Sequence, residues 1–271
     1  MNTAFDPSLA TFAEADPARR RRRLTRAQVD TFNRDGWLAP LPGFDAAGAA
    51  ANRAAFDRLL AEFAARGHDS YAINGYHRNC ASIWDVVAHP PLVDYAVDLL
   101  GDDVVAWGAH YFCKLPGDGK NVAWHQDAPY WALNPTRTVT VWLAIDDVDV
   151  GNGAMHVIPG SHRLGALRMR DSRPEENNVL WLSLDGAEGL AAPEPVVLRA
   201  GECSLHSDLT VHGSPANASS RRRAGLAIRY AHASVRSPAN WNEQAIIVAG
   251  SDPSGHWRHV PRPEGDRPFA D

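Results

Sequence analysis

The sequence is poor in cysteine and lacks the cysteine spacing that disulfide frameworks and zinc sites need. Only Cys80, Cys113 and Cys203 occur in 271 residues, an odd number with no Cys-x-x-Cys pair. We therefore expect three reduced, buried thiols. Hydrophobic residues make up 45% and charged residues 22% of the chain, which is typical of globular proteins and excludes collagen-like, coiled-coil or wholly disordered chains.

Long apolar runs and an excess of positive charge are also missing. No stretch approaches the roughly 18 consecutive apolar residues of a transmembrane helix. The N-terminal segment does not combine a basic start with an apolar run, so it does not resemble a signal peptide. A net charge of -5 offers no general attraction for nucleic acid or anionic membranes. We expect a cytoplasmic protein without such partners, and the sequence leaves its oligomeric state open.

The chain is long enough for one large domain. Residues 1–23 mix Ala, Pro and charge and end in the run Arg19–Arg23, which repels itself and predicts a flexible N-terminal arm. A nucleic-acid-binding arm is the alternative, but one short basic run beside an acidic body would bind only weakly. Residues 24–271 contain no repeat or low-complexity linker, so they are predicted to form a single domain.

Helical patterns dominate the first hundred residues. Thr25–Gln28 has the spacing of a capping box, which predicts a short helix ending near Gly36. Apolar residues at helical spacing predict further helices over 45–65 and 91–100, and Trp37–Pro42 is predicted to be extended.

After Gly101 the sequence changes to short runs rich in Val, Ile, Tyr and Trp, separated by Gly, Pro, Asn and Asp. This pattern predicts strands joined by turns, arranged as an antiparallel sandwich or barrel rather than a parallel sheet. The expected fold is an all-β core with flanking α-helices. The predicted strands are VVAWGAHYF, TVTVWLAI, AMHVI, PVVL, ECSLH and GLAIRY.

Histidine is abundant, with 12 residues in the chain. His125 and Asp127 project to the same side of an extended segment, so they can converge on one metal ion. A His-x-Asp pair alone is weak evidence, because His206 and Asp208 form a second one. A third ligand is needed, and the candidates are His206 and His212.

The surroundings of His212 favour it as the third ligand. A polar turn separates it from a strand that begins with Arg223, which predicts that the two lie near each other across a hairpin. A metal ion beside a fixed guanidinium would hold a dicarboxylate at both ends. Two His residues and one carboxylate with open coordination positions make up the facial triad of non-haem Fe(II) oxygenases.

Three segments together resemble the phytanoyl-CoA dioxygenase-like family of Fe(II)/2-oxoglutarate-dependent oxygenases. They are HQD at 125–127, NGAMHVIPGSHR at 152–163, and the run H-x-S-x-x-N-x-S-x-x-x-R that ends at Arg223. The resemblance covers roughly residues 25–232. It implies a double-stranded β-helix, that is, a cupin-like jelly roll, in agreement with the strand pattern.

The resemblance also implies roles for individual residues. His125, Asp127 and His212 would be the iron ligands, and hence the catalytic centre, with Arg223 pairing with the distal carboxylate of 2-oxoglutarate. Further cosubstrate contacts are expected at Ser214, Gln126, Trp142 and His110, and for Trp142 core packing is an equal alternative. Possible substrate contacts are Phe112, Tyr130, Trp131 and Arg229. Arg229 has the same parity as Arg223 along its strand, so it could face the interior and meet an anionic group of the substrate, although it would equally suit an internal ion pair.

The expected activity is oxidation of an unactivated C–H bond of a small molecule, using Fe(II), 2-oxoglutarate and O2. Related halogenases replace the carboxylate ligand with a small residue, so Asp127 favours hydroxylation, desaturation or cyclisation over halogenation. We expect a substrate from specialised metabolism or an amino-acid derivative, selected by loops within 70–82 and 171–190. Two alternatives remain open: a zinc metallohydrolase using the same three ligands, and a jelly-roll binding protein without catalysis.

Overall fold

Two antiparallel sheets form the centre of the molecule in the computed structural model, which describes residues 6–12 and 21–269. The larger sheet has six strands, in the order β1 (Trp37–Pro42), β9 (Glu202–Ser207), β4 (Thr138–Ala144), β11 (Arg223–His232), β2 (Val104–Lys114) and β12 (Ile246–Ala249).

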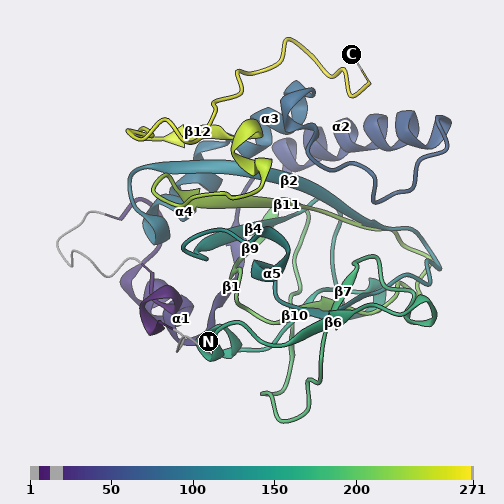
Figure 1. The fold of residues 1–271 in the computed structure, drawn as a ribbon. Helices are drawn as coiled ribbons and strands as arrows, with labels where there is room; N and C mark the ends of the chain where they lie inside the picture. The colour runs from purple at the N-terminus through teal and green to yellow at the C-terminus, as the bar shows by residue number, and fades with distance from the viewer. Residues whose placement is uncertain (1–5, 13–20, 270–271) are drawn as a thin grey trace.

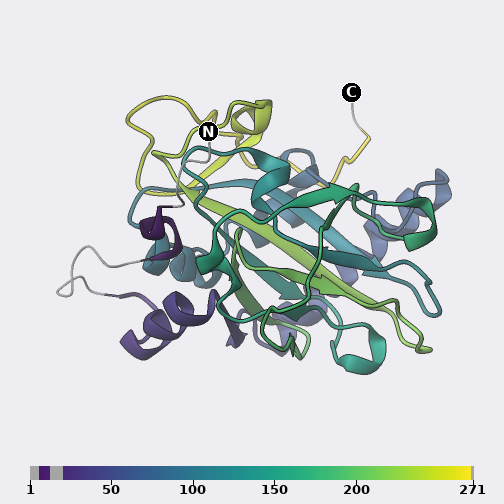
Figure 2. The same ribbon diagram turned by 60° about the horizontal axis from the view of Figure 1, so that its bottom comes forward.

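The smaller sheet contains four strands, in the order β3 (Val122–His125), β10 (His212–Ser214), β5 (His156–Val157) and β8 (Glu194–Pro195). A separate ribbon pairs β6 (Met169–Asp171) with β7 (Leu182–Leu184). In Figure 1 the larger sheet lies above β10 and β6, and Figure 2 brings this lower layer toward the viewer. The predicted all-β core is thus a jelly roll. The run AMHVI contributes only the two-residue strand β5. Of the predicted strand PVVL only Pro195 lies in β8, and Leu198 forms an isolated bridge with Val148.

Five α-helices accompany the sheets within the described residues, together with short 3-10 helices. The α-helices are α1 (Arg26–Asp35), α2 (Ala46–Ala65), α3 (Ala81–Val87), α4 (Pro90–Leu100) and α5 (Ala128–Trp131). The 3-10 helices are η1 (Pro7–Ala10), η2 (Tyr76–Arg78), η3 (Val150–Asn152), η4 (Ser161–Leu164), η5 (Pro174–Glu176) and η6 (Asn240–Gln244).

Helix α1 begins and ends where the sequence predicts. The side chain of Thr25 accepts a hydrogen bond from the backbone amide of Gln28, and the Gln28 side chain accepts one from the backbone amide of Thr25, which completes the capping box. Gly36 ends the helix with a φ of 79°, a left-handed conformation that glycine adopts without strain.

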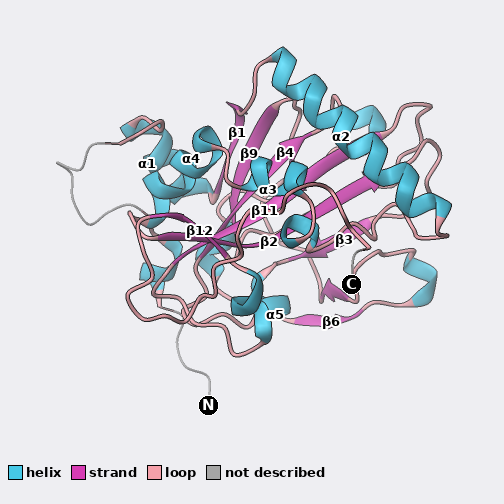
Figure 3. Ribbon diagram, turned by 90° about the horizontal axis from the view of Figure 1, so that it is seen from above, coloured by secondary structure: helices cyan, strands magenta, loops and turns pink. Residues whose placement is uncertain are grey.

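Helices α2, α3 and α4 cover the outer face of the larger sheet, as Figure 3 shows for α2. Phe56, Leu59 and Phe63 on α2 are buried in the main core, and the rings of Phe56 and Tyr111 lie 4.6 Å apart. Burial of each such side chain contributes about 2 kcal/mol. This helical layer leaves the opposite face of the larger sheet free to form a pocket.

Strand β11 shows how the larger sheet divides its side chains between core and pocket. Leu226, Ile228 and Tyr230 belong to the main core under the helices. Arg223 and Arg229 line the cavity on the other face. Because successive side chains of a strand point to opposite faces, both arginines face inward, as the sequence predicts from their shared parity.

The segment predicted to be a flexible arm is only partly within the described residues. Where it is described, it contacts the domain: Phe12 is fully buried and its ring lies 5.1 Å from that of Phe32. The backbone amides of Arg22 and Arg23 donate to the carboxylate of Asp98 on α4. These parts are docked because an apolar side chain and a buried carboxylate hold them, which the charge pattern alone does not reveal.

Two further expectations concern cysteine and membranes. Cys80, Cys113 and Cys203 are free and buried, as predicted. Over residues 6–12 and 21–269, no helix has both the length and the apolar character that crossing a membrane requires.

Candidate metal centre and cosubstrate pocket

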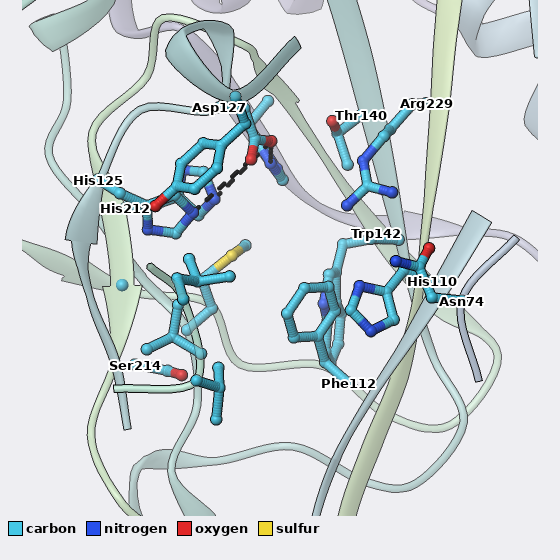
Figure 4. Close-up of a pocket in the computed structure, with 18 of the residues that line it drawn as sticks. Asn74, His110, Phe112, His125, Asp127, Thr140, Trp142, His212, Ser214 and Arg229 are labelled. Atoms are coloured by element: carbon cyan, nitrogen blue, oxygen red, sulfur yellow. Dashed lines mark ion pairs between the residues drawn. The ribbon is translucent and has the colours of Figure 1, made fainter. Parts of the chain in front are cut away.

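A cavity of about 320 Å³ lies between the two sheets. The smaller sheet contributes His125, His212 and Ser214, and the larger sheet contributes Trp142 and Arg223. The strand order brings together residues almost a hundred positions apart, because β3 and β10 are neighbours in the smaller sheet. Of the sequence-predicted site residues, all but Gln126 therefore line one pocket, and Figure 4 labels most of them.

His125 and His212 are direct neighbours across β3 and β10. Asp127 follows the end of β3, with the intervening residue turned away, so its carboxylate returns to the same side. His125 Nε2 lies 3.6 Å from Asp127 Oδ1 and His212 Nε2 lies 4.0 Å from Asp127 Oδ2. One possible ligand atom from each of the three residues lies within 4.8 Å of the others.

Backbone hydrogen bonds fix the orientation of both imidazoles. His125 Nδ1 lies 2.9 Å from the Ala123 carbonyl, and His212 Nδ1 lies 2.9 Å from the Thr210 carbonyl. Each Nδ1 thus carries the proton and donates it, which leaves each Nε2 with its lone pair directed toward Asp127. Metal-binding histidines are typically held in this way, with one ring nitrogen donating to a backbone carbonyl and the other free to bind the metal.

The electrostatics of the cluster favour the protonation states that bind metal. Burial alone would raise the pKa of Asp127, but its contacts with the imidazoles of His125, His206 and His212 hold it well below its usual range. Burial, reinforced by the adjacent imidazoles, lowers the pKa of His212 well below its usual value. A carboxylate and a neutral imidazole are the forms that coordinate a metal ion.

This donor set fits a divalent first-row metal ion. Two imidazole nitrogens and a carboxylate oxygen suit Fe(II) or Zn(II). An ion about 2.1 Å from each ligand atom spans separations of up to about 4.2 Å, which matches the 3.6 and 4.0 Å distances from the carboxylate. All three residues are buried, so the ion would be shielded from bulk water.

Arg223 provides a buried positive charge in the same cavity. It is 2% exposed, donates through Nε and Nη2 to the Gly153 carbonyl, and donates through Nη2 to Ser214 Oγ at 3.1 Å. Burial lowers its pKa to about 10, so the guanidinium stays charged at neutral pH. Among the described residues no carboxylate forms an ion pair with it, which leaves it available to an anionic ligand.

The route by which Arg223 reaches the pocket differs from the expectation. The predicted hairpin between His212 and Arg223 is wrong, because β10 pairs with β3 and β5 whereas β11 pairs with β2 and β4. The connection crosses from one sheet to the other. The Ser214 to Arg223 hydrogen bond nevertheless joins the two segments, since the sheets face each other across the cavity.

Gln126 does not have the role expected of it. It is fully buried, its Nε2 donates to the carbonyls of Gly165 and Leu209, and its Oε1 accepts from the Leu167 amide. It points away from the pocket because it alternates with His125 along the extended segment. Its amide ties three loops together and is not available to a cosubstrate.

Aromatic side chains form much of the remaining pocket wall. Trp142, Phe112 and His110 line the larger sheet's side, and the ring of Trp142 lies 5.5 Å from the Arg223 guanidinium carbon. Trp142 fits only because Gly225 lies beside it: a Cβ at that position would come within 2.1 Å of the indole. The Nε2 of His110 donates to the Tyr71 carbonyl at 2.8 Å, and burial lowers its pKa to about 3, so it is a neutral wall residue.

The residues predicted to contact substrate also line the cavity. Tyr130 and Trp131 come from α5, directly after the metal cluster, and Arg229 comes from β11. The Tyr130 hydroxyl donates to the Leu182 carbonyl. The exposed Trp181 packs edge-on against Tyr130 and lines both this cavity and an outer one. Selection of substrate by residues 171–190 stays a prediction.

Three polar residues of the pocket, Asn74, Thr140 and His206, were not predicted as site residues. Thr140 lies two positions before Trp142 on β4, so strand parity could have identified it. The sequence left His206 as an alternative metal ligand or as a residue that lines the site and supports a ligand. Its Nε2 lies 3.7 Å from Asp127 Oδ2 and its ring lies 4.5 Å from that of His212.

Comparisons with known proteins agree with this geometry. A family model described as phytanoyl-CoA dioxygenase (PhyH) matches residues 32–225. Phytanoyl-CoA dioxygenase domain-containing protein 1 of Mus musculus is 32% identical over 163 residues, which are 57% of this chain and 55% of that protein. A probable alpha-ketoglutarate-dependent hypophosphite dioxygenase of Stutzerimonas stutzeri is 31% identical over 158 residues, 56% and 54% of the two chains. The chain spans about half the length of these curated relatives.

A solved structure resembles nearly the whole chain. ThoJ in its apo form, described as a non-heme monooxygenase, superposes with a TM-score of 0.75 at 30% sequence identity and covers 88% of each chain. This match confirms the fold class that the sequence predicts.

Proposed function

The chain belongs to the phytanoyl-CoA dioxygenase family, and from that membership we propose that it is an Fe(II)/2-oxoglutarate-dependent dioxygenase that oxidises a C–H bond of a small molecule. The proposed cofactors are Fe(II), 2-oxoglutarate and O2. The single observation that carries the proposal is the convergence of His125, Asp127 and His212 in one cavity beside the buried Arg223, which forms no ion pair with any described residue. The cosubstrate dependence named for the bacterial relative supports it.

Each of these residues has a distinct part in the proposed mechanism. His125, Asp127 and His212 would hold the iron, which when bound supplies the oxidising chemistry together with 2-oxoglutarate and O2. Their backbone hydrogen bonds keep the imidazoles oriented without rearrangement. Arg223 and Ser214 would bind the distal carboxylate of 2-oxoglutarate by charge-assisted hydrogen bonds.

The apolar wall has the task of positioning substrate and excluding water. Phe112, Trp142 and Met155 line the cavity together with Tyr130 and Trp131. Exclusion of water strengthens the electrostatic interactions between the pocket and the cosubstrate, and it limits side reactions. Holding the target carbon in a fixed place converts the oxidation into an effectively intramolecular step.

Asp127 bears on the type of oxidation. We propose hydroxylation, or a related desaturation or ring closure, rather than halogenation, because the carboxylate ligand is present where related halogenases have a small residue. A substrate from specialised metabolism is part of this proposal.

Formation of succinate from 2-oxoglutarate, measured with Fe(II), O2 and a panel of small organic molecules, tests the proposal. Asp127→Ala is expected to lower both iron binding and succinate formation by more than about 100-fold. Loss of a residue that only hydrogen-bonds to a metal ligand already lowers metal affinity or activity by about 10–100-fold. Asp30→Ala is the matched control, because Asp30 forms only an exposed ion pair with Arg26 on α1. It should behave as the wild type.

Full activity in Asp127→Ala would contradict the ligand assignment. Absence of succinate with every candidate substrate, combined with Zn(II)-dependent hydrolysis, would replace the proposal with the metallohydrolase alternative.

A further inference from the structure

Three polar side chains form a row across neighbouring strands of the larger sheet. His206 on β9 is the register partner of Thr140 on β4, and Thr140 is the partner of Arg229 on β11. All three line the same cavity. In Figure 4, Thr140 and Arg229 lie on the side of the pocket opposite His125 and His212. The row is distinct from Arg223 and Ser214, which lie near the other end of β11.

Several buried polar atoms of this row have no hydrogen-bond partner among the described residues. Arg229 Nε, Thr140 Oγ1 and both ring nitrogens of His206 are buried and unsatisfied. Thr140 is 1% exposed and His206 is 2% exposed. Since more than about nine in ten buried polar groups are normally hydrogen-bonded, a cluster of unsatisfied atoms on one pocket wall indicates a missing polar ligand.

Arg229 is held in place by packing rather than by an ion pair. Its guanidinium carbon lies 5.1 Å from the ring of Trp131 and 5.9 Å from that of Trp107. Within the described part of the chain no carboxylate reaches ion-pair distance. The internal-pair alternative considered for this arginine is therefore not seen, and the indole rings instead fix the direction of the guanidinium.

Among the described residues that line the pocket, Arg229 is left without a counter-charge. Asp127, the acid that opposes the lowering of the Arg229 pKa by burial, would be engaged by the metal ion. Arg223 would be engaged by the cosubstrate. The positive charge of Arg229 is then uncompensated in a desolvated site, which favours a bound anion.

We propose that Arg229 and Thr140 bind a carboxylate of the substrate, so that the substrate class is that of small monocarboxylic acids with an apolar body. This inference rests on the proposed function and extends it to the substrate. The planar fork of the guanidinium suits a carboxylate bidentately. A phosphate dianion would need more hydrogen-bond donors than this row supplies, and it would also need a second cation beside Arg229.

The proposal also orients the substrate. With its carboxylate on Arg229, the carbon chain extends across the cavity toward the metal ligands, along the wall formed by Trp131 and Trp142. Larger substituents have a way out past Val179, Leu180 and Trp181, which line this cavity and the outer one.

A pair of matched probes tests this subsite without turnover. The full chain is loaded with Ni(II) and 2-oxoglutarate, and binding of 3-phenylpropanoate and of its amide is measured by calorimetry. The wild type is expected to bind the acid at least about tenfold more tightly than the amide, which is the value of a charge-assisted hydrogen bond. Arg229→Gln should remove this preference, Arg229→Lys should retain part of it, and Thr140→Val should weaken it to a smaller extent.

Two further measurements separate substrate binding from other roles. Arg229→Gln should leave the Kd for 2-oxoglutarate unchanged, whereas Arg223→Gln should raise it by about two to four decades, because a buried carboxylate loses its partner. The thermal midpoint of Arg229→Gln should equal or exceed that of the wild type, since a residue kept for binding costs stability when its ligand is absent.

Three results would overturn the inference. One is a wild type that binds the acid no better than the amide, including one that binds neither. Another is an acid preference that survives in Arg229→Gln. The third is a rise in the Kd for 2-oxoglutarate in Arg229→Gln comparable to that in Arg223→Gln, which would make Arg229 a cosubstrate residue. A wild type that does not bind 2-oxoglutarate would instead refute the proposed function.

Discussion

Lys114 and Arg223 bring two positive charges together at the start of β11. They are register partners on β2 and β11, and Lys114 is fully buried with its ammonium donating to the carbonyls of Ser214 and Pro215. Burial, with the charge of Arg223 added, lowers the pKa of Lys114 to about 7. A lysine that readily becomes neutral reduces repulsion beside the proposed cosubstrate arginine.

This lowered pKa predicts a pH-dependent stability. Between about pH 7 and 10 the unfolded chain keeps the Lys114 proton while the folded protein releases it, so the free energy of unfolding rises with pH. The gain is at most about 1.4 kcal/mol per pH unit. Urea unfolding of the apoprotein at several pH values, compared with Lys114→Met, isolates this contribution. A difference between the two proteins that stays constant from pH 7 to 10 would contradict it.

At the scale of residues, the sequence predicted side chains whose spacing along a strand determines their direction. His125 and Asp127 at i and i+2, and Arg223 and Arg229 at matching parity, all line the pocket. Thr140 could have been found by the same parity argument, applied from Trp142. The cosubstrate role expected for Gln126 does not fit its position. Gln126 lies between two inward-facing residues, so its side chain points into the loops behind the pocket.

At the scale of elements, α4 anchors the chain that leads into α1. The Asp98 carboxylate, 3% exposed, accepts from the backbone amides of Arg22, Arg23 and Leu24 at 2.7 Å each. This contact joins the N-terminal segment to a helix more than seventy residues away in sequence. It has no local sequence signal, which explains why the segment was expected to be flexible.

Asp98→Ala should therefore destabilise the protein by about 1–3 kcal/mol, because three amide donors lose a buried acceptor. The comparison is with Asp94→Ala on the same helix, which removes only a partly exposed ion pair with Arg22 and should cost less than about 1 kcal/mol. Equilibrium urea unfolding measures both. Equal losses would show that the buried carboxylate is not the anchor.

Local signals predicted elements better than the connections between them. The capping box of α1 and its final Gly36 define the helix by contacts within one turn. The link between β10 and β11 was expected to be a hairpin because the two segments are close in sequence. It crosses between sheets instead, and such a choice depends on the packing of the whole jelly roll.

At the scale of the whole molecule, the two sheets have different surroundings and together enclose the cavity. The helices cover one face of the larger sheet, and the smaller sheet covers the other while leaving the cavity between them. The short strand-forming segments predicted the all-β core, and three motifs predicted the family. Both predictions were possible because each signal lies within a short stretch of sequence. The row of His206, Thr140 and Arg229 was not foreseen, since it depends on the order of three strands that are far apart in sequence.

The central claim is that His125, Asp127 and His212 hold one iron ion and that Arg223 binds the far carboxylate of 2-oxoglutarate. Anomalous diffraction at the iron edge, from crystals grown anaerobically with Fe(II) and 2-oxoglutarate, tests it most directly. We predict a single iron peak between the two Nε2 atoms and the Asp127 carboxylate, with the cosubstrate extending from the metal to Arg223. A peak on a different set of residues, or a cosubstrate carboxylate bound to Arg229 instead, would contradict the account.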